Sequence, residues 1–343
     1  MRNRSERAGL DASVLHFPFM SWPSGSAWWN PYPFKKAGRK PYFSPDGKVA
    51  LMFLKAYTGL SAPKLMEQLN ANVHYQLFCG IRINPKDPLT NYKLIDDIAL
   101  ELSRCLRVQG QQEALAEAWK PYMKVLNTLH ADATCHESAM RYPTDAKLLW
   151  ECIGNYGSGD AKGSIPNRIV SVGKPYVRPI VRGKEVKDVE SAAKCNNIQL
   201  DGISFIEKLS FNAFNEGARL KHCVKPAERL FGERVTKLAG DYSCSGNENR
   251  SFCDGREIET SFPQKGRKRE AAASAGMVRK ELARVRATAM EGPFGTQKEH
   301  YGLKRINGRI RKMEILIIFF GIHTANAVRL AKRLEEAGPG QAA

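Results

Sequence analysis

Paired metal-ligand spacings are missing from this sequence. The chain has eight cysteines and seven histidines among 343 residues, yet it contains no Cys-x-x-Cys and no His-x-x-x-His spacing. Zinc knuckles need such pairs, and a disulfide framework is typical of short secreted chains with regularly spaced cysteines. Both are therefore excluded as organising features, and we expect the thiols to be reduced.

Long hydrophobic runs are also missing. The longest, residues 315–322, has eight residues, whereas a membrane-spanning helix needs roughly 20. The first residues are basic, but polar groups and Pro18 interrupt the apolar residues after them, so no signal peptide is predicted. We expect a cytoplasmic protein that has no membrane partner.

Acidic residues are in the minority. The chain has 53 Lys and Arg against 35 Asp and Glu, a formal net charge of +18. Such an excess indicates a polyanionic partner, and nucleic acid fits better than a membrane surface. The alternative is a basic protein with no specialised partner.

The N-terminal third is predicted to be an arm followed by helices. Residues 1–45 mix Trp, Pro, Gly and Ser without periodicity, which indicates an extended or disordered arm. Residues 46–126 show helical spacing of apolar residues, with Gly59 ending one helix and Ser61 and Pro63 starting the next. We predict a helical DNA-binding domain here. Its first two helices suit a helix-turn-helix, and a helical bundle with another role suits the pattern equally.

The remainder is predicted to be an α/β domain over residues 127–335, followed by a tail at 336–343. It would begin with a strand from Asn127 that carries Asp132 near its end, and a short helix would come after Pro143. A Gly- and Ser-rich linker is expected at 154–166. Further elements are expected as strands at 168–186, 203–206 and 235–239, a helix within 210–231, an Ala-rich helix up to Glu291 and a core helix at 310–334.

Glu291 is the first candidate for chemistry. Between Phe262 and Glu314 there are fourteen Lys and Arg against five Asp and Glu, which is half of the net charge of the chain. Glu291 lies inside this basic segment, with Lys298 seven positions later. A carboxylate in such surroundings is a candidate for holding a cation.

Two more carboxylates are expected at strand ends, Asp132 and Asp241. If they converge with Glu291, the cluster repels itself unless cations fill it, and hard oxygen ligands suit Mg²⁺. Two such ions ~3.5–4 Å apart would serve phosphodiester chemistry. Pattern alone does not prefer these three acids over Asp145, Asp201 or Glu216.

A family resemblance selects among them. Five segments resemble bacterial insertion-sequence transposases of the DDE class: ADATCHESAMRYPTDAKLLWE, RIVSVGKPYVRPIVRGK, DGISFIEKLSFNAFNEG, GNENRSFCDGREIETSFPQKGRKRE and MEGPFGTQKEHYGLKRI. The helical segment FLKAYTGLSAPKLMEQLNANVHYQLFCGI is similar to their N-terminal region. Together these segments span roughly residues 40 to 335.

The resemblance implies an α/β fold, an RNase H-like mixed sheet flanked by helices and preceded by a helical N-terminal domain. It implies cut-and-paste movement of an insertion sequence by metal-dependent phosphodiester hydrolysis and strand transfer at terminal inverted repeats. Asp132, Asp241 and Glu291 would be the catalytic acids and would hold Mg²⁺ or Mn²⁺, as two ions. The partners would be double-stranded DNA, at the element ends and the target, and a second copy of the chain on DNA.

DNA-binding side chains are expected around these acids. The resemblance assigns such a role to Lys298, near the DNA backbone, and to Asn249 and Arg250, which would position DNA or support the second acid. Basic side chains expected on the strands after the linker and in the segment after Glu291 complete the set: Arg178, Arg182, Lys304 and Arg305.

Departures from the family keep other hypotheses open. The Gly- and Ser-rich break comes almost directly after the first acid, which suggests an internal deletion, and the residues after Asp241 are irregular. Pro293 within a helix would cost ~3 kcal/mol, so the helix should end or kink near Glu291. The alternatives are a catalytically dead, internally deleted relic that only binds DNA and, further away, an unrelated basic helical scaffold.

Overall fold

The computed structural model describes residues 41–105, 107–140, 153–154, 170–171, 173–181, 189–264 and 273–337. Four predictions fall wholly or mostly outside these residues: the arm at 1–45, the helix after Pro143, the linker at 154–166 and the tail at 336–343. Arg182 also lies outside the described residues.

The N-terminal helices begin and end where capping residues predict. Helix α2 (Pro45–Thr58) comes after Ser44, whose hydroxyl accepts a 3.0 Å hydrogen bond from the Gly47 N–H, and it ends at Gly59 with φ of 62°. Asn72 then starts a separate helix, because its side chain accepts from two N–H groups of the next turn. The helices of this region are α3 (Ala62–Ala71), α4 (Val73–Phe78), α5 (Lys93–Cys105) and α6 (Val108–Trp119).

Within the described part of the chain, seven strands form a mixed sheet at the centre of the molecule. The strands are β1 (Thr128–Ser138), β2 (Arg178–Val181), β3 (Val189–Leu200), β4 (Ile203–Ser210), β5 (Lys237–Ala239), β6 (Glu259–Thr260) and β7 (Arg305–Ile306). Strand β3 is antiparallel to β1, β2 and β4, whereas β5 and β7 run parallel to β1, and β6 runs parallel to β5. The order through the middle of the sheet is therefore β4-β3-β1-β5-β6.

Strand β3 is not predicted by the pattern of apolar residues in the sequence. Its buried side chains include Asn196, Asn197 and Gln199, which do not mark a strand by alternation. Asp201 and Gly202 join β3 to β4 with positive φ values of 47° and 78°. An Asp-Gly dipeptide favours this two-residue turn, so the hairpin had a local signal in the sequence.

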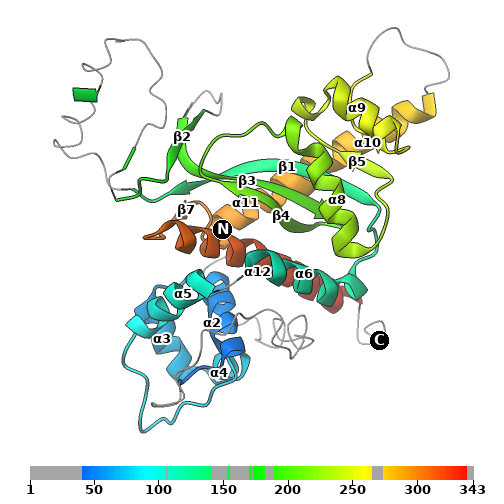
Figure 1. The fold of residues 1–343 in the computed structure, drawn as a ribbon. Helices are drawn as coiled ribbons and strands as arrows, with labels where there is room; N and C mark the ends of the chain where they lie inside the picture. Colours follow the sequence, from blue (N-terminus) through cyan, green and yellow to red (C-terminus); the bar gives the residue numbers. More distant parts are fainter. Residues whose placement is uncertain are drawn as a thin grey trace.

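Helices cover both faces of this sheet. In Figure 1, α8 (Leu220–Phe231) lies in front of the sheet, where it contacts β1, β3 and β4. Behind the sheet runs a continuous helical segment made of α10 (Ala273–Arg286), the π turn η6 (Ala287–Glu291) and α11 (Gly292–His300). The short helix α9 (Asn247–Asp254) comes after β5.

Helix α12 (Arg311–Ala337) connects the sheet to the N-terminal helices. It contacts β4 on one side and α2 and α5 on the other (Figure 1), and the rings of Phe53 and Phe320 meet edge to face at 4.9 Å. Among the described residues, α12 alone is long and apolar enough to cross a membrane, and 72% of its most apolar window is buried inside the protein. That burial is the pattern of a core helix, as its apolar sequence predicts.

These elements make the protein a mixed α/β fold, as expected. Buried side chains from Phe43 to Leu330 form one continuous hydrophobic core, to which the N-terminal helices and the sheet both contribute. The division into domains at residue 126 stays a prediction.

Candidate active site

The pairing of β1 with β5 brings two of the predicted acids level with each other. His130 on β1 pairs with Ala239 on β5 in a parallel register. Asp132 comes two residues after His130, and Asp241 comes two residues after Ala239. Because the two segments run parallel, both acids lie at the same height. Asp132 is the fifth residue of the eleven-residue β1; the expectation that it lies near the strand end is therefore wrong.

Arg286 joins the two carboxylates. Its Nη1 donates to Asp132 Oδ2 at 2.8 Å and its Nη2 donates to Asp241 Oδ1 at 3.2 Å. The other oxygen of Asp132 accepts a 2.8 Å hydrogen bond from the Ala133 N–H. The Asp132 and Arg286 side chains are 18% and 19% exposed, against 46% for Asp241. Two acids separated by more than a hundred residues thus share one cationic group.

Burial raises the pKa of Asp132 above its ordinary value, because removing a carboxylate from water disfavours its charged form. The positive charge of Arg286 opposes this shift, and the negative charge of nearby Glu216 adds to it. Arg286 therefore favours the ionised form of Asp132, which burial disfavours.

Glu291 is the last residue of the π turn η6, and it is exposed. This turn packs against β1. A π turn bonds residue i to residue i+5, so five positions along the chain bring Glu291 back toward the side of the helix that carries Arg286. The structure nevertheless shows no ion pair between Glu291 and another described residue.

Pro293 neither ends the helical segment nor interrupts a regular α-helix. It lies at the start of α11, directly after the π turn. The residues before it, Glu291 and Gly292, keep right-handed helical dihedrals, so the proline lies inside a continuous segment and its missing N–H is accommodated by the π turn. The π turn before Pro293 therefore lets the helical segment that carries Glu291 continue without a break.

Asn249 and Arg250 both fasten the turn η4 (Tyr242–Cys244), which comes directly after Asp241. The Asn249 side chain is buried and donates to the carbonyls of Gly217 and Cys244 at 2.7 and 2.9 Å. Arg250 donates to the carbonyls of Ser245 and Pro263 at 2.8 and 2.6 Å. These contacts support the backbone next to the second acid.

Replacing Gly217 by alanine is expected to disturb this turn. A Cβ at residue 217 would lie 2.3 Å from the carbonyl oxygen of Ser243, two residues after Asp241. Overpacking of this kind costs ~1–3 kcal/mol, which thermal unfolding would detect. The matched control is Gly246→Ala, where nothing lies within 4 Å. Equal melting temperatures for the two variants would contradict the expectation.

The other predicted DNA-binding residues are spread over the molecule. Arg178 lies on the edge strand β2 and donates to the Val177 carbonyl at 3.0 Å, and Lys304 pairs with Glu299 at 2.9 Å. Arg305 lies on β7, level with Glu137 of β1. Lys298 is half-buried on α11, two helical turns after Glu291. Of these four residues, Lys298 is the one that helical spacing places on the same side of a helix as a candidate acid, Glu291.

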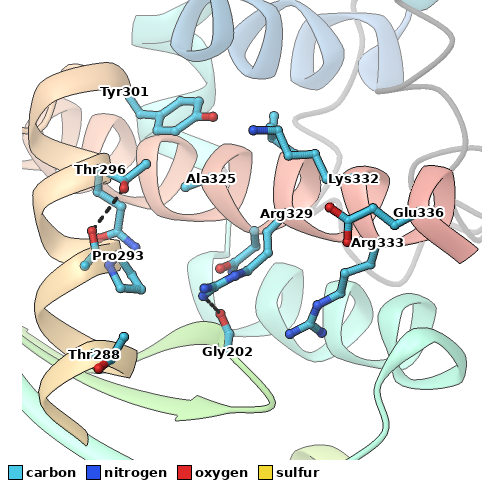
Figure 2. A pocket seen from close by; sticks show the side chains of 14 residues that line it. Gly202, Thr288, Pro293, Thr296, Tyr301, Ala325, Arg329, Lys332, Arg333 and Glu336 are labelled. Atoms are coloured by element: carbon cyan, nitrogen blue, oxygen red, sulfur yellow. Dashed lines mark hydrogen bonds between the residues drawn. The ribbon is translucent and has the colours of Figure 1, made fainter. Parts of the chain in front are cut away.

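A groove of about 580 Å³ lies between α11 and α12, on the other flank of the same helical segment. Figure 2 shows Thr288, Pro293 and Thr296 along one wall, with Arg329 of α12 reaching the Gly202 carbonyl at 2.7 Å. None of the candidate acids lines it. Two of its basic side chains, Arg329 and Arg333, donate hydrogen bonds to Gly202 and Asp201 in the β3–β4 turn.

Sequence reasoning missed Arg286. The basic composition around residue 286 offers many arginines, and nothing local distinguishes this one. The sequence pattern did not distinguish Glu216 from the three candidate acids. In the structure its negative charge raises the pKa of Asp132, and it forms an ion pair with Lys194 at 2.7 Å. Arg286 and Glu291 are five residues apart, and this spacing places them on one side of the helix only because the turn between them is a π turn.

The arrangement fits a cation held jointly by Asp132 and Asp241, since the Arg286 guanidinium already stands between them. Among the described residues, no group of three or more His, Cys, Asp or Glu side chains is placed to hold a metal ion. The structure therefore brings two of the three predicted ligands together and leaves Glu291 apart.

Comparison with known proteins points to transposition. Residues 21–97 match the model of the family described as Transposase domain (DUF772). No curated protein and no solved structure matches the chain. The match supports a transposase family for this protein. It does not define the catalytic class, because residues 21–97 precede all three candidate acids.

Proposed function

We propose that this protein is a DDE-class DNA transposase that moves an insertion sequence by cut-and-paste chemistry. The observation that carries the proposal is the meeting of Asp132 and Asp241 at one cationic group, on adjacent parallel segments of a mixed sheet. The transposase-domain match at residues 21–97 supports the same role from a separate part of the chain.

The sheet supports an RNase H-like core. In the order β4-β3-β1-β5-β6, the first three strands are antiparallel, and β1, β5 and β6 are parallel. An RNase H-like sheet has this order and these directions. The first acid on the central strand and the second after the neighbouring parallel strand suit the proposal that this sheet is the catalytic scaffold.

Asp132 and Asp241 would hold Mg²⁺ or Mn²⁺ in this proposal, and Glu291 would join them from η6. Two such ions, when bound, activate the attacking oxygen and stabilise the leaving oxygen of a phosphodiester. The chain contributes the rest: Asn249 and Arg250 hold the Asp241 turn in place, and Lys298, two helical turns after Glu291, would lie near the DNA backbone. Double-stranded DNA and a second copy of the chain are the partners we infer.

One observation favours a second candidate, a relic that binds DNA without cutting it. Glu291 is exposed, and the described residues show no three-acid group. A chain with only two converging acids would keep its basic surface and lose catalysis.

The deciding experiment uses the short inverted repeats expected to flank the coding region. The full chain is incubated with labelled DNA that carries these ends, in Mg²⁺, in Mn²⁺ or in EDTA. We expect strand cleavage at the element ends that needs the metal. Salt-dependent binding with no cleaved product in either metal would reject the enzyme and favour the relic.

Glu291→Gln tests the third acid separately. We expect cleavage to fall by about tenfold or more, because a metal ligand is lost, whereas affinity for the DNA ends stays close to that of the wild type. Glu299→Gln, on the same helix and paired with Lys304 at the surface, is the control. Unchanged cleavage by Glu291→Gln would remove Glu291 from the site.

A further inference from the structure

We propose that Arg286 is the counter-cation of the metal-free site, and that a divalent cation binds by displacing its guanidinium group. This inference rests on the proposed function, because it presumes that Asp132 and Asp241 hold a metal. It concerns a positioning residue to which neither the family resemblance nor the transposase-domain match assigns a role.

The first argument is geometric. The two terminal nitrogens of Arg286 reach one carboxylate each, at 2.8 Å for Asp132 and 3.2 Å for Asp241. The guanidinium therefore fills the space that a cation shared by these carboxylates would occupy. Both oxygens of Asp132 already accept a hydrogen bond, one from Arg286 and one from the Ala133 N–H. A metal ion bound to the same oxygen as Arg286 would lie next to a second positive charge, and each contact would weaken the other.

The second argument is electrostatic. Asp132 and Arg286 are both largely shielded from water, so charges at this point are weakly screened. A divalent ion and a guanidinium placed between the same two carboxylates would repel each other. The reverse also holds: with neither cation present, two carboxylates would face each other, and Glu216 would add a third negative charge nearby.

The third argument is that only the two carboxylates anchor the Arg286 side chain among the described residues. Arg286 is the last residue of α10, immediately before the π turn. Its side-chain hydrogen bonds within the described residues go to Asp132 and Asp241 alone. A long side chain with no other anchor can rotate away without any change in the helix.

Removing the guanidinium should therefore have opposite effects on the two states. Without metal, Arg286→Gln loses the group that neutralises the carboxylates, so the melting temperature falls. With metal, the ion no longer competes with a built-in cation, so affinity rises. Charge-assisted hydrogen bonds of this kind correspond to about tenfold or more in affinity.

The test is a Mn²⁺ titration of the full chain without DNA, with free Mn²⁺ measured by electron paramagnetic resonance. We expect Arg286→Gln to bind Mn²⁺ about tenfold more tightly than the wild type, and its melting temperature to rise more when Mn²⁺ is added. Arg284→Gln is the matched control, because that exposed arginine pairs only with Glu281 on its own helix. Arg286→Lys, which keeps a charge but cannot bridge two carboxylates, should fall between the wild type and Arg286→Gln and serves if Arg286→Gln is poorly folded.

The outcomes separate this inference from the proposed function. Equal or weaker Mn²⁺ binding by folded Arg286→Gln and Arg286→Lys, with clear binding by the wild type, overturns the role of Arg286 and leaves the metal site standing. No binding by any variant overturns the metal site itself, and the inference with it. Tight binding by Arg286→Gln that survives the addition of Asp132→Asn would place the ion elsewhere and overturn the inference.

Discussion

Asp132→Asn is expected to reduce cleavage of element-end DNA by ~100-fold or more. An amide is a poor substitute for a metal-binding carboxylate, and loss of even supporting contacts to a metal commonly costs ~10–100-fold. The change also removes the charge that holds Arg286 at 2.8 Å, so Arg286 would no longer be shared between two acids. The measurement is the initial rate of strand cleavage in Mg²⁺ at saturating protein.

The control for this variant is Asp97→Asn on α5, an exposed acid remote from the sheet. Affinity for the DNA ends should change little in either variant, since a carboxylate does not attract phosphates. Cleavage by Asp132→Asn within a few-fold of the wild type would show that the meeting of Asp132 with Asp241 is structural and not catalytic.

Lys174→Met is expected to destabilise the protein by ~3–5 kcal/mol, because it leaves a buried carboxylate without its partner. The Glu314 side chain is completely buried; it lies 2.5 Å from Lys174 Nζ and accepts a 2.7 Å hydrogen bond from Ser138. These contacts join the end of β1, the segment before β2 and the first turn of α12. Burial, and then the charge of Glu314, also raises the pKa of the neighbouring Tyr176.

Chemical denaturation provides the measurement, with two further variants for comparison. Lys55→Met breaks an exposed pair with Asp96 and should cost less than ~1 kcal/mol. Combining Lys174→Met with Glu314→Leu removes both charges and should recover most of the loss, since an apolar pair can replace a buried ion pair. A Lys174→Met variant as stable as Lys55→Met would show that the buried pair contributes little.

Helices were the most predictable part of this fold. Gly59, Ser61 and Pro63 act through their own backbone and nearest neighbours, so the local sequence placed the break between α2 and α3. The separate start of α4 at Asn72 was not predicted. The apolar pattern of α12 likewise predicts a core helix, and 72% of its most apolar window is buried. Strand β3 escaped prediction because it buries polar side chains such as Asn196, whose amide donates to Glu207 on β4, a partner that local sequence does not reveal.

The candidate site was predictable only in part. Strand β5 was expected to deliver Asp241, and it does so two residues after Ala239. That Asp132 lies level with Asp241 depends on the parallel register between β1 and β5, which pairs segments about 110 residues apart. The position of Glu291 depends on a π turn, whereas sequence alone indicated an ended or kinked helix at Pro293.

The sequence by itself determined the basic charge, several helix boundaries and the mixed α/β character, because these depend on composition, capping and residue periodicity. The candidate acids came from the family resemblance, since the pattern of residues did not distinguish them from other acids. The tertiary structure alone decided which charges meet. It brought Asp132 and Asp241 to one guanidinium, placed Arg286 where a shared cation would bind, and left Glu291 exposed at the end of η6. The physical reason is that strand register and helix packing act between distant segments, and electrostatic partners are chosen by proximity in space.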